Sequence, residues 1–465
     1  LTQDGGKTWK NVTPPEMPDF GRVSQIDASG FNSGAAYVSV RRPLLDDMAP
    51  YIFKTADYGR TWTRITSGIR SDAYVHVVRE DSNRRGMLYA GTQHGVYLSY
   101  DDGAAWQLLN PGLPDVPVVD LIVEGNELVI ASHGRGFWVL DNIAPLRQLT
   151  PTIASAPVAL FRPPTGVRSG PGVIVSWRLE APAQAARLEI LDSAGAILRT
   201  FRIDSLTKEV RDSITKAAEG GFGRSGGGGF LPNGAGINRM AWDLRTEGAT
   251  TFPGMILWGA RTVGPVVPPG RYTIRLVADD RTVTVPARVV RNPRITDVTE
   301  ADLHAQYAFS KRVRDKVTEA NEAVVAIRRV KSQVADRLKQ SADGRLKEAG
   351  TTLTTNASGV EENIYQVRNQ SNQDPLNFPI RVNNRLANLM SMAERGDGRP
   401  TNNMPEIFGI LSAELKGYTD RLALVWDKDL AAFNAELGRL GLPLVDPKCA
   451  KPEGCQPGPD GRPIS

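Results

Sequence analysis

The phrase TQDGGKTW at residues 2–9 returns as TADYGRTW at 55–62 and, with more changes, as SYDDGAAW at 99–106. An aspartate carboxylate accepts backbone N–H groups inside a tight turn, and glycine adopts backbone angles denied to other residues. Tryptophan then buries a large apolar surface beside the turn. The phrase therefore predicts a structural turn between two strands. Its structural positions are Asp4, Gly6 and Trp9, then Asp57, Gly59 and Trp62, and then Asp101, Gly103 and Trp106.

The spacing of the phrases predicts repeated sheets. Their aspartates are 53 and then 44 residues apart, which is the period of a four-stranded propeller blade. Segments with alternating apolar residues lie between them, and residues 116–142 show the same alternation without the phrase. Residues 1–147 thus predict about three blades of a partial β-propeller. A closed ring has four or more blades, so we expect upstream sequence or a second chain to complete it. A chain that opens on LTQDGGKTW is expected to be a processed or truncated piece.

Composition excludes several classes of function. The 465 residues suggest about three domains, and 56 basic against 51 acidic side chains give a net charge of +5. This surplus is too small to indicate a nucleic-acid or membrane partner. No apolar run reaches the roughly 18–20 residues of a transmembrane segment. The four histidines have no metal-type spacing, so we expect neither a metal site nor a cofactor.

The middle and C-terminal parts change character. Short alternating strands over 148–298 predict an immunoglobulin- or fibronectin-like β-sandwich. Two insertions interrupt it: a Gly-rich segment at 219–236, expected to be a solvated loop, and a Trp258-containing loop at 251–270, expected to pack on its surroundings. From Thr299 the apolar residues recur every three or four positions, which predicts an antiparallel helical bundle over 299–442. Its helices are expected at 299–341, 358–370, 380–395 and 407–437.

The tail at 443–465 is rich in Pro and Gly and predicts irregular structure. It carries both cysteines, Cys449 and Cys455, which either close a small loop as a disulfide or remain two free thiols. The short spacing favours the disulfide, and a disulfide indicates an oxidising compartment.

Several phrases in a fixed order resemble one family. Besides the turns, which look like the Asp-box of sialidase-type propellers, they are ASHGRGFWVLDN (131–142), INRMAWDLR (237–245), FPGMILWGA (252–260), PPGRYTIRL (268–276) and DPLNFPIRVNNRLANL (374–389). The chain resembles, over nearly its whole length, the C-terminal half of bacterial sortilin-type Asp-box (BNR repeat) propeller proteins, often labelled glycosyl hydrolase-like. The resemblance implies a protein that is secreted, periplasmic or on the outer cell surface of a bacterium. The hydrolase label follows the fold, and a fold does not fix a function.

Two sets of residues are candidates for a site. A glycosidase needs two carboxylates across the sugar, and Asp120, Glu124 and Asp141 are the candidates in the last blade. In SHGRGFWVLD (132–141), His133 and Arg135 lie between glycines, and His94 lies in the similar TQHG turn of the preceding blade. These side chains can bind an anion or a peptide at one rim of the propeller, or they can simply bond to neighbouring loops.

Two functions follow from these expectations. The first is a secreted interaction protein that binds protein or glycan and takes part in assembly, including assembly with copies of itself. The alternative is a glycoside hydrolase with acidic residues lining the propeller channel. The sequence leaves open whether the chain is an enzyme.

Overall fold

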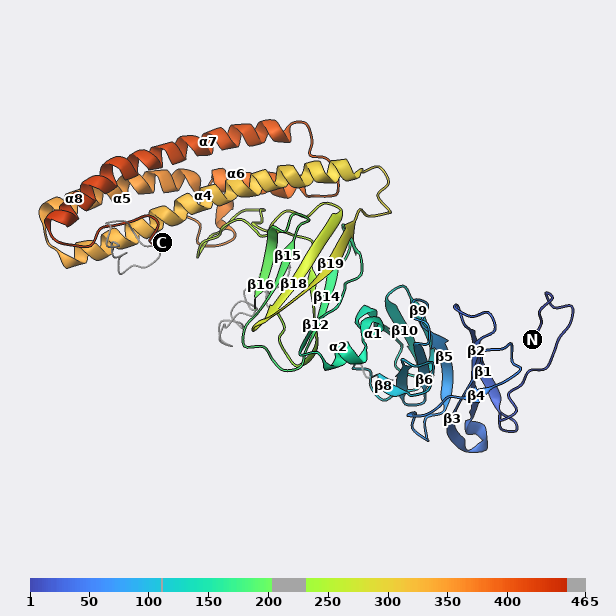
Figure 1. Cartoon of the computed structure of the whole chain (residues 1–465). Coiled ribbons are helices and arrows are strands. Elements are labelled where there is room, and N and C mark those ends of the chain that lie inside the picture. Colours follow the sequence, from blue (N-terminus) through green and yellow to red (C-terminus); the bar gives the residue numbers. More distant parts are fainter. Residues whose placement is uncertain (110–111, 203–230, 450–465) are drawn as a thin grey trace. The chain divides into compact units, whose positions relative to one another are not determined.

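The computed structural model describes residues 1–109, 112–202 and 231–449. Its contacts divide the chain into two compact units. Unit 1 holds residues 1–164, 176–181 and 235–238, and unit 2 holds 165–175, 182–234 and 239–465. Both contain β-structure and unit 2 also contains the C-terminal helices (Figure 1). The expected mixed class, mainly β and then α, is confirmed.

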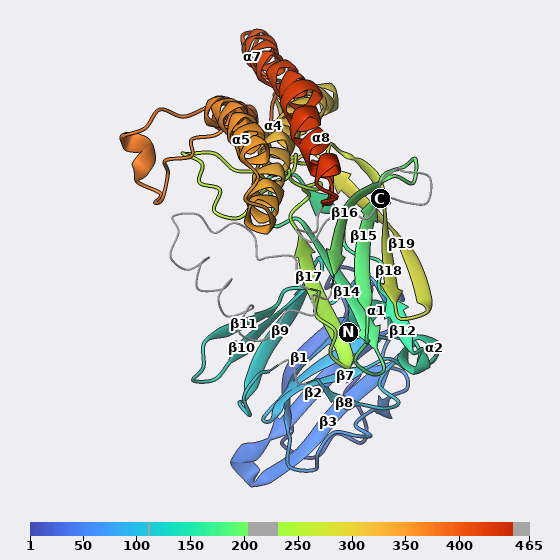
Figure 2. The same cartoon turned by 90° about the vertical axis from the view of Figure 1, so that its left-hand side faces the viewer.

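Three antiparallel sheets follow one another in unit 1, from β1 to β11 (Figures 1 and 2). The first and second have four strands each and the third has three, so the arrangement is propeller-like. The first sheet contains β1 (Arg22–Ala28), β2 (Ala36–Arg42), β3 (Asp47–Thr55) and β4 (Thr63–Arg64). The second contains β5 (Val75–Glu80), β6 (Leu88–Thr92), β7 (Gly95–Ser99) and β8 (Gln107–Leu109). The third contains β9 (Val118–Glu124), β10 (Glu127–Ser132) and β11 (Phe137–Leu140), and short helices α1 (Ala144–Gln148) and α2 (Pro151–Ser155) follow it.

Two apolar cores join the three sheets face to face. Tyr37 and Ile52 of the first sheet pack with Val78 and Tyr97 of the second. The opposite face of the second sheet packs on the third through residues such as Tyr89, Val96, Leu121 and Ile130. The second sheet is therefore buried on both faces, as a blade inside a propeller is.

The repeated phrases form one hydrogen-bonded turn three times. Backbone N–H groups four residues downstream donate to Oδ1 of Asp4, Asp57 and Asp101, each at 2.9 Å. Hydrogen bonds from the backbone and side chain of Thr8 lower the pKa of Asp4 to about 2, and those from Thr61 do the same at Asp57. The second and third turns connect β3 to β4 and β7 to β8.

Unit 2 contains a five-stranded sheet in the order β13-β19-β18-β15-β16. Neighbouring strands are antiparallel except β13 and β19, which are parallel. The strands are β13 (Gly166–Val167), β15 (Ala186–Leu191), β16 (Ile197–Arg202), β18 (Gly270–Ala278) and β19 (Arg281–Val290). A three-stranded sheet joins β12 (Val158–Leu160), β14 (Val173–Leu179) and β17 (Gly236–Trp242), and β14 and β17 have residues in both units. The immunoglobulin-like topology and the domain boundaries stay predictions.

The two predicted insertions differ in what the structure describes. Residues 219–230 of the Gly-rich segment lie outside the described residues. The loop at 251–270 packs on the helices: the Trp258 N–H donates to Asn384 Oδ1 at 2.7 Å, and the Ile256 N–H donates to the Tyr365 hydroxyl at 3.0 Å. Cys449 is buried and Cys455 lies outside the described residues, so their pairing stays a prediction.

The helices of unit 2 pack their buried apolar residues into one shared core. They are α4 (Glu300–Gln340), α5 (Gly344–Ile364), α6 (Val382–Ala393), α7 (Met404–Val425) and α8 (Ala431–Arg439), with a π-helical turn at Trp426–Leu430. Thr299 and Asp302 form a reciprocal capping box at the start of α4. Asp343 caps α5, which therefore begins earlier than the predicted 358 and ends at Ile364. None of the helices described has the apolar run that a bilayer crossing requires.

Candidate functional site

The first strand of each propeller-like sheet has a β-bulge at the same position. The register skips one residue between Val23 and Gln25 in β1 and between Val75 and Val77 in β5. In β9, Val118 and Asp120 face consecutive residues of β10, so Val119 is the extra residue. A bulge re-aims one side chain, and the bulge in β5 does so for His76.

The His76 imidazole is buried beside an arginine. Its Nδ1 lies 3.0 Å from Nη1 of Arg41. A guanidinium only donates, so Nδ1 accepts and the neutral ring carries its proton on Nε2. No hydrogen bond of good geometry reaches Nε2 from the described residues. Burial and the charge of Arg41 lower the pKa of His76 to about 4, and the charge of His133 acts in the same direction, while Gln93 opposes it. His76 is therefore neutral at pH 7. Its contribution to stability is complete above about pH 6.5 and is lost as the pH falls towards 4.

His94 lies in the turn between β6 and β7 and is held by a carboxylate. Its Nδ1 is 2.9 and 3.2 Å from the two carboxylate oxygens of Asp115. A cavity of about 220 Å³ opens beside this pair. Arg70 and Asp115 supply its charged edge, and its apolar wall consists of Tyr97, Leu108, Leu109, Leu113 and Pro114. The mixture fits an apolar side chain with polar groups next to it.

The turn of His133 and Arg135 lies next to that of His94. The His133 N–H donates to the Pro117 carbonyl at 2.9 Å, and the Gly95 N–H donates to the Val116 carbonyl at 3.1 Å. The two-residue segment 116–117 therefore lies between the two turns. The side chains of His133 and Arg135 are exposed. The structure thus places all three basic candidates at one rim of unit 1.

The three carboxylate candidates are not gathered there. Asp120 lies on β9, with its side chain 58% exposed and 3.5 Å from an Nη atom of Arg79. The same arginine lies 3.1 Å from Asp27 of β1, so a guanidinium bridges these two carboxylates. Glu124 ends β9 and Asp141 follows β11, and the register puts both at the end of the third sheet opposite the His133 turn.

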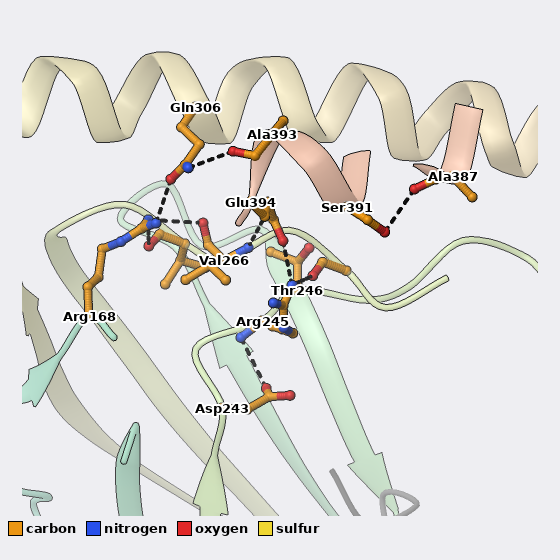
Figure 3. Close-up of polar contacts among 12 residues, drawn as sticks. Arg168, Asp243, Arg245, Thr246, Val266, Gln306, Ala387, Ser391, Ala393 and Glu394 are labelled. Carbon is orange, nitrogen blue, oxygen red and sulfur yellow. Dashed lines mark hydrogen bonds and ion pairs between the residues drawn. The ribbon is translucent and has the colours of Figure 1, made fainter. Parts of the chain in front are cut away.

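A second polar cluster lies in unit 2, between the strands and the helices (Figure 3). Arg168, only 2% exposed, pairs with Asp397 at 2.9 Å and donates to Gln306 Oε1 of α4 at 2.7 Å. Arg245 pairs with Glu394 at 2.6 Å, and Glu394 also accepts the Val266 N–H at 3.0 Å. The partners are up to 229 residues apart, so no local motif in the sequence could reveal them.

The described residues hold no cluster of three or more His, Cys, Asp or Glu side chains able to bind a metal ion. In the second cluster Arg168 pairs with Asp397 and Arg245 pairs with Glu394. At the rim, His94 pairs with Asp115, and Arg70 pairs with Asp72. The rim can therefore recognise a ligand by hydrogen bonds and apolar contacts.

Comparisons with known proteins give weak likenesses. No family model and no curated protein matches the chain. Among solved structures, YCF48 bound to D1 peptide has a TM-score of 0.23 and 16% identity, covering 39% of this chain and 56% of that one. YCF48 from Cyanidioschyzon merolae gives 0.21 and 16%, covering 38% and 54%. A GH74 enzyme from Niastella koreensis gives 0.22 and 14%, covering 57% and 38%. The chain thus spans about half or less of the length of these proteins. Structural similarity at these TM-scores is not evidence for the fold or the function of this chain.

Proposed function

We propose that this chain is part of a secreted or envelope-exposed, sortilin-like Asp-box propeller protein that binds other proteins. It holds a peptide segment at the rim formed by the turns at 92–95 and 132–136. As a propeller it needs more blades than the three sheets of unit 1, from upstream sequence or from a second chain.

The cavity beside His94 is the observation that carries this proposal. Its wall is mainly leucine and tyrosine, and its edge carries the Arg70 guanidinium and the Asp115 carboxylate. An apolar peptide side chain fills such a cavity, while backbone amides of the peptide bond to the charged edge. The exposed His133 and Arg135 extend the same rim and attract acidic groups of the ligand.

A glycan is less well matched by this rim. Sugar sites present polar groups to many hydroxyls, whereas the wall of this cavity is apolar. The glycoside hydrolase alternative needs two carboxylates that face each other across a sugar. Here Asp120 and Asp27 share Arg79, and Glu124 and Asp141 lie at the other end of the third sheet. The geometry therefore favours binding over hydrolysis.

A peptide-display selection tests this function. The whole chain is exposed to a random peptide library, and the enriched peptides are titrated by fluorescence anisotropy. We expect His94→Ala and Leu113→Asp each to weaken binding about tenfold or more, because a buried contact is worth about 1.4 kcal/mol or more. His304→Ala, an exposed histidine of α4, is the matched control and should leave affinity unchanged.

A glycan array probed with the same protein provides the second arm. Failure to enrich peptides, or peptide binding that ignores His94 and Leu113, contradicts the proposal. Glycans that bind and depend on His94 would move the ligand class from peptide to sugar.

A further inference from the structure

A cavity of about 240 Å³ lies within unit 2, lined by both members of the buried ion pair of Arg168 and Asp397. Its lining comes from the turn that follows β13, the segment that follows β17, helix α4 and the loop that follows α6; Figure 3 shows part of this region. All of these segments belong to unit 2, so the cavity is independent of the propeller assignment and of the peptide site. Its charged residues are Arg168, Asp243, Arg245, Glu394, Arg395 and Asp397.

The Arg168 guanidinium has no N–H group left for a ligand. Its Nε and Nη2 both donate to one oxygen, Asp397 Oδ1, at 3.2 and 2.9 Å. Nη2 also donates to Gln306 Oε1 at 2.7 Å, and Nη1 donates to the Val267 and Val266 carbonyls at 2.8 and 3.3 Å. These bonds use every N–H group that a guanidinium has. Arg168 therefore holds Asp397 in place and offers nothing further to a ligand.

Asp397 keeps one carboxylate oxygen without a partner. Its side chain is 7% exposed, and its Oδ2 accepts no hydrogen bond from any residue that the structure describes. A buried carboxylate oxygen without a hydrogen bond costs free energy, which a donor bound there recovers. A cationic donor makes the strongest such bond, because its charge is opposite to that of the carboxylate. Gly396 and Gly398 flank Asp397 and give its backbone the freedom to adjust to that donor.

Two arginines of the same cavity have N–H groups available. Arg245 uses only Nη1, which donates to the Gly264 carbonyl at 2.7 Å and to Glu394 Oε2 at 2.6 Å. Its Nε and Nη2 donate to none of the described residues, and the exposed Arg395 side chain pairs with no described carboxylate. Guanidinium N–H groups in this state are suited to a carboxylate, which accepts two of them at once.

Two residues of the cavity lining have a left-handed backbone. The φ angle is +57° at Ser169 and +61° at Leu244. Residues other than glycine adopt such angles rarely, at a cost of about 1 kcal/mol or more, and they are concentrated at ligand sites. Ser169 directly follows Arg168, and Leu244 directly precedes Arg245. The strained backbone thus lies beside two of the three arginines that line the cavity.

We propose that this cavity binds a small zwitterion, a free amino acid. The ammonium group donates to Asp397 Oδ2, and the carboxylate accepts from Arg395 and from the available N–H groups of Arg245. Arg395 and Asp397 are two residues apart in one loop, so their Cα atoms are at most about 7 Å apart and one small molecule reaches both.

Charge and size both favour this class of ligand. Three arginines and three carboxylates line the cavity, so a ligand without net charge leaves the balance unchanged. A simple anion bonds to the arginines and leaves Asp397 Oδ2 without a donor, and a neutral polyol forms no ion pair at either group. The volume of about 240 Å³ equals that of about eight water molecules, which suits a free amino acid better than a protein segment.

Ligand-observed NMR of the whole chain tests the proposal. The twenty standard L-amino acids are screened one by one by saturation transfer, with acetate and D-glucose as the probes for simple anions and polyols. We expect one or more small amino acids to bind. The amide of that amino acid, which lacks the carboxylate, and its deaminated acid, which lacks the ammonium group, should each bind about tenfold or more weakly.

Three variants locate the binding. Arg395→Gln should weaken binding of the amino acid about tenfold or more and should leave binding of the amide unchanged. Asp397→Asn retains an oxygen for Arg168 but removes the negative charge, so it should weaken binding of the amino acid and leave that of the deaminated acid unchanged. Arg399→Gln is the matched control: Arg399 lies in the same loop, pairs with Asp302 at 2.9 Å and does not line the cavity. It should leave affinity unchanged.

Failure of every amino acid to bind at about 10 mM overturns the proposal, and so does binding that Arg395→Gln leaves unchanged. Acetate or D-glucose that binds as tightly as the best amino acid overturns it as well, since the site would then recognise an anion or a polyol. Melting temperatures show whether each variant folds, and the exposed Arg395 decides the outcome if Asp397→Asn does not fold. Peptide binding at the His94 cavity is measured separately, so failure of one proposal leaves the other intact.

Discussion

At the scale of single residues, the repeated turn follows from local chemistry. Asp57 accepts its hydrogen bonds from residues within four positions, so the sequence alone predicts it. The glycine of the phrase has a longer-range reason as well. A Cβ on Gly103 would lie 2.4 Å from Cδ1 and 3.0 Å from Cβ of Ile65, on the preceding sheet. This contact is invisible until the sheets are stacked.

Gly103→Ala should therefore destabilise unit 1 more than a Gly→Ala substitution at a position where no atom lies near the new Cβ. Gly134→Ala is the matched control, because its φ of +85° resembles the +87° of Gly103 and no atom lies within 4 Å of its new Cβ. We expect about 1 kcal/mol from backbone strain at Gly134, and a further 1–2 kcal/mol, roughly, from overpacking at Gly103. Urea unfolding followed by tryptophan fluorescence measures both. Equal losses of unfolding free energy in the two variants would show that the contact between Gly103 and Ile65 does not contribute to stability.

The burial and the lowered pKa of His76 could not be predicted from the sequence. Its burial and lowered pKa depend on a bulge in β5 and on Arg41 from another sheet. Nothing in the residues adjacent to His76 distinguishes it from an ordinary strand residue. The turns of His94 and His133 were identified from their Gly-flanked phrases, but the Asp115 partner and the cavity required the fold.

At the scale of elements, apolar periodicity predicted α4, α6 and α7 well, because the stripe recurs every three to four residues. The start of α5 was missed because residues 344–357 are rich in Thr, Gly and Ala and have a weak stripe. The ion pairs of Arg168 with Asp397 and of Arg245 with Glu394 could not be predicted, since their partners lie far apart in sequence.

Removing only one partner of the Arg168–Asp397 ion pair should strongly destabilise unit 2. Both side chains are almost fully buried, at 2% and 7% exposed. Arg168→Met leaves a buried carboxylate without its partner and should cost on the order of 3 kcal/mol, whereas Arg168→Met with Asp397→Leu should recover most of that loss. Circular dichroism at 222 nm during urea unfolding reads the stability of unit 2.

Arg281→Met is the control for the Arg168→Met variant. Arg281 is 55% exposed and 3.9 Å from Asp280, so its loss should cost less than about 0.5 kcal/mol. A double variant as unstable as Arg168→Met alone would contradict a paired role for Asp397.

At the scale of the whole molecule, the chain joins a propeller-like unit to a unit of strands and long helices. The mixed class followed from one change of hydrophobic period, from alternation to a helical stripe at Thr299. The number of sheets in unit 1 followed from the spacing of the turns together with the alternation of residues 116–142, which lack the repeated phrase. The exposed outer faces required the structure, because exposure at Ile26 and Phe137 is visible only when the equivalent positions of the second sheet are seen buried.

We interpret the three sheets as successive blades that pack on one another in the same way, with the outer faces of the first and third sheets open. Hydrogen–deuterium exchange of the whole chain tests this interpretation most directly, through the central strands β2, β6 and β10, each hydrogen-bonded on both sides. The second sheet packs against a neighbouring sheet on both faces, whereas the first and third sheets do so on one face each. The amides of β6 should therefore exchange about tenfold or more slowly than those of β2 and β10. Equal protection of the three strands would show that the first and third sheets are not open on their outer faces.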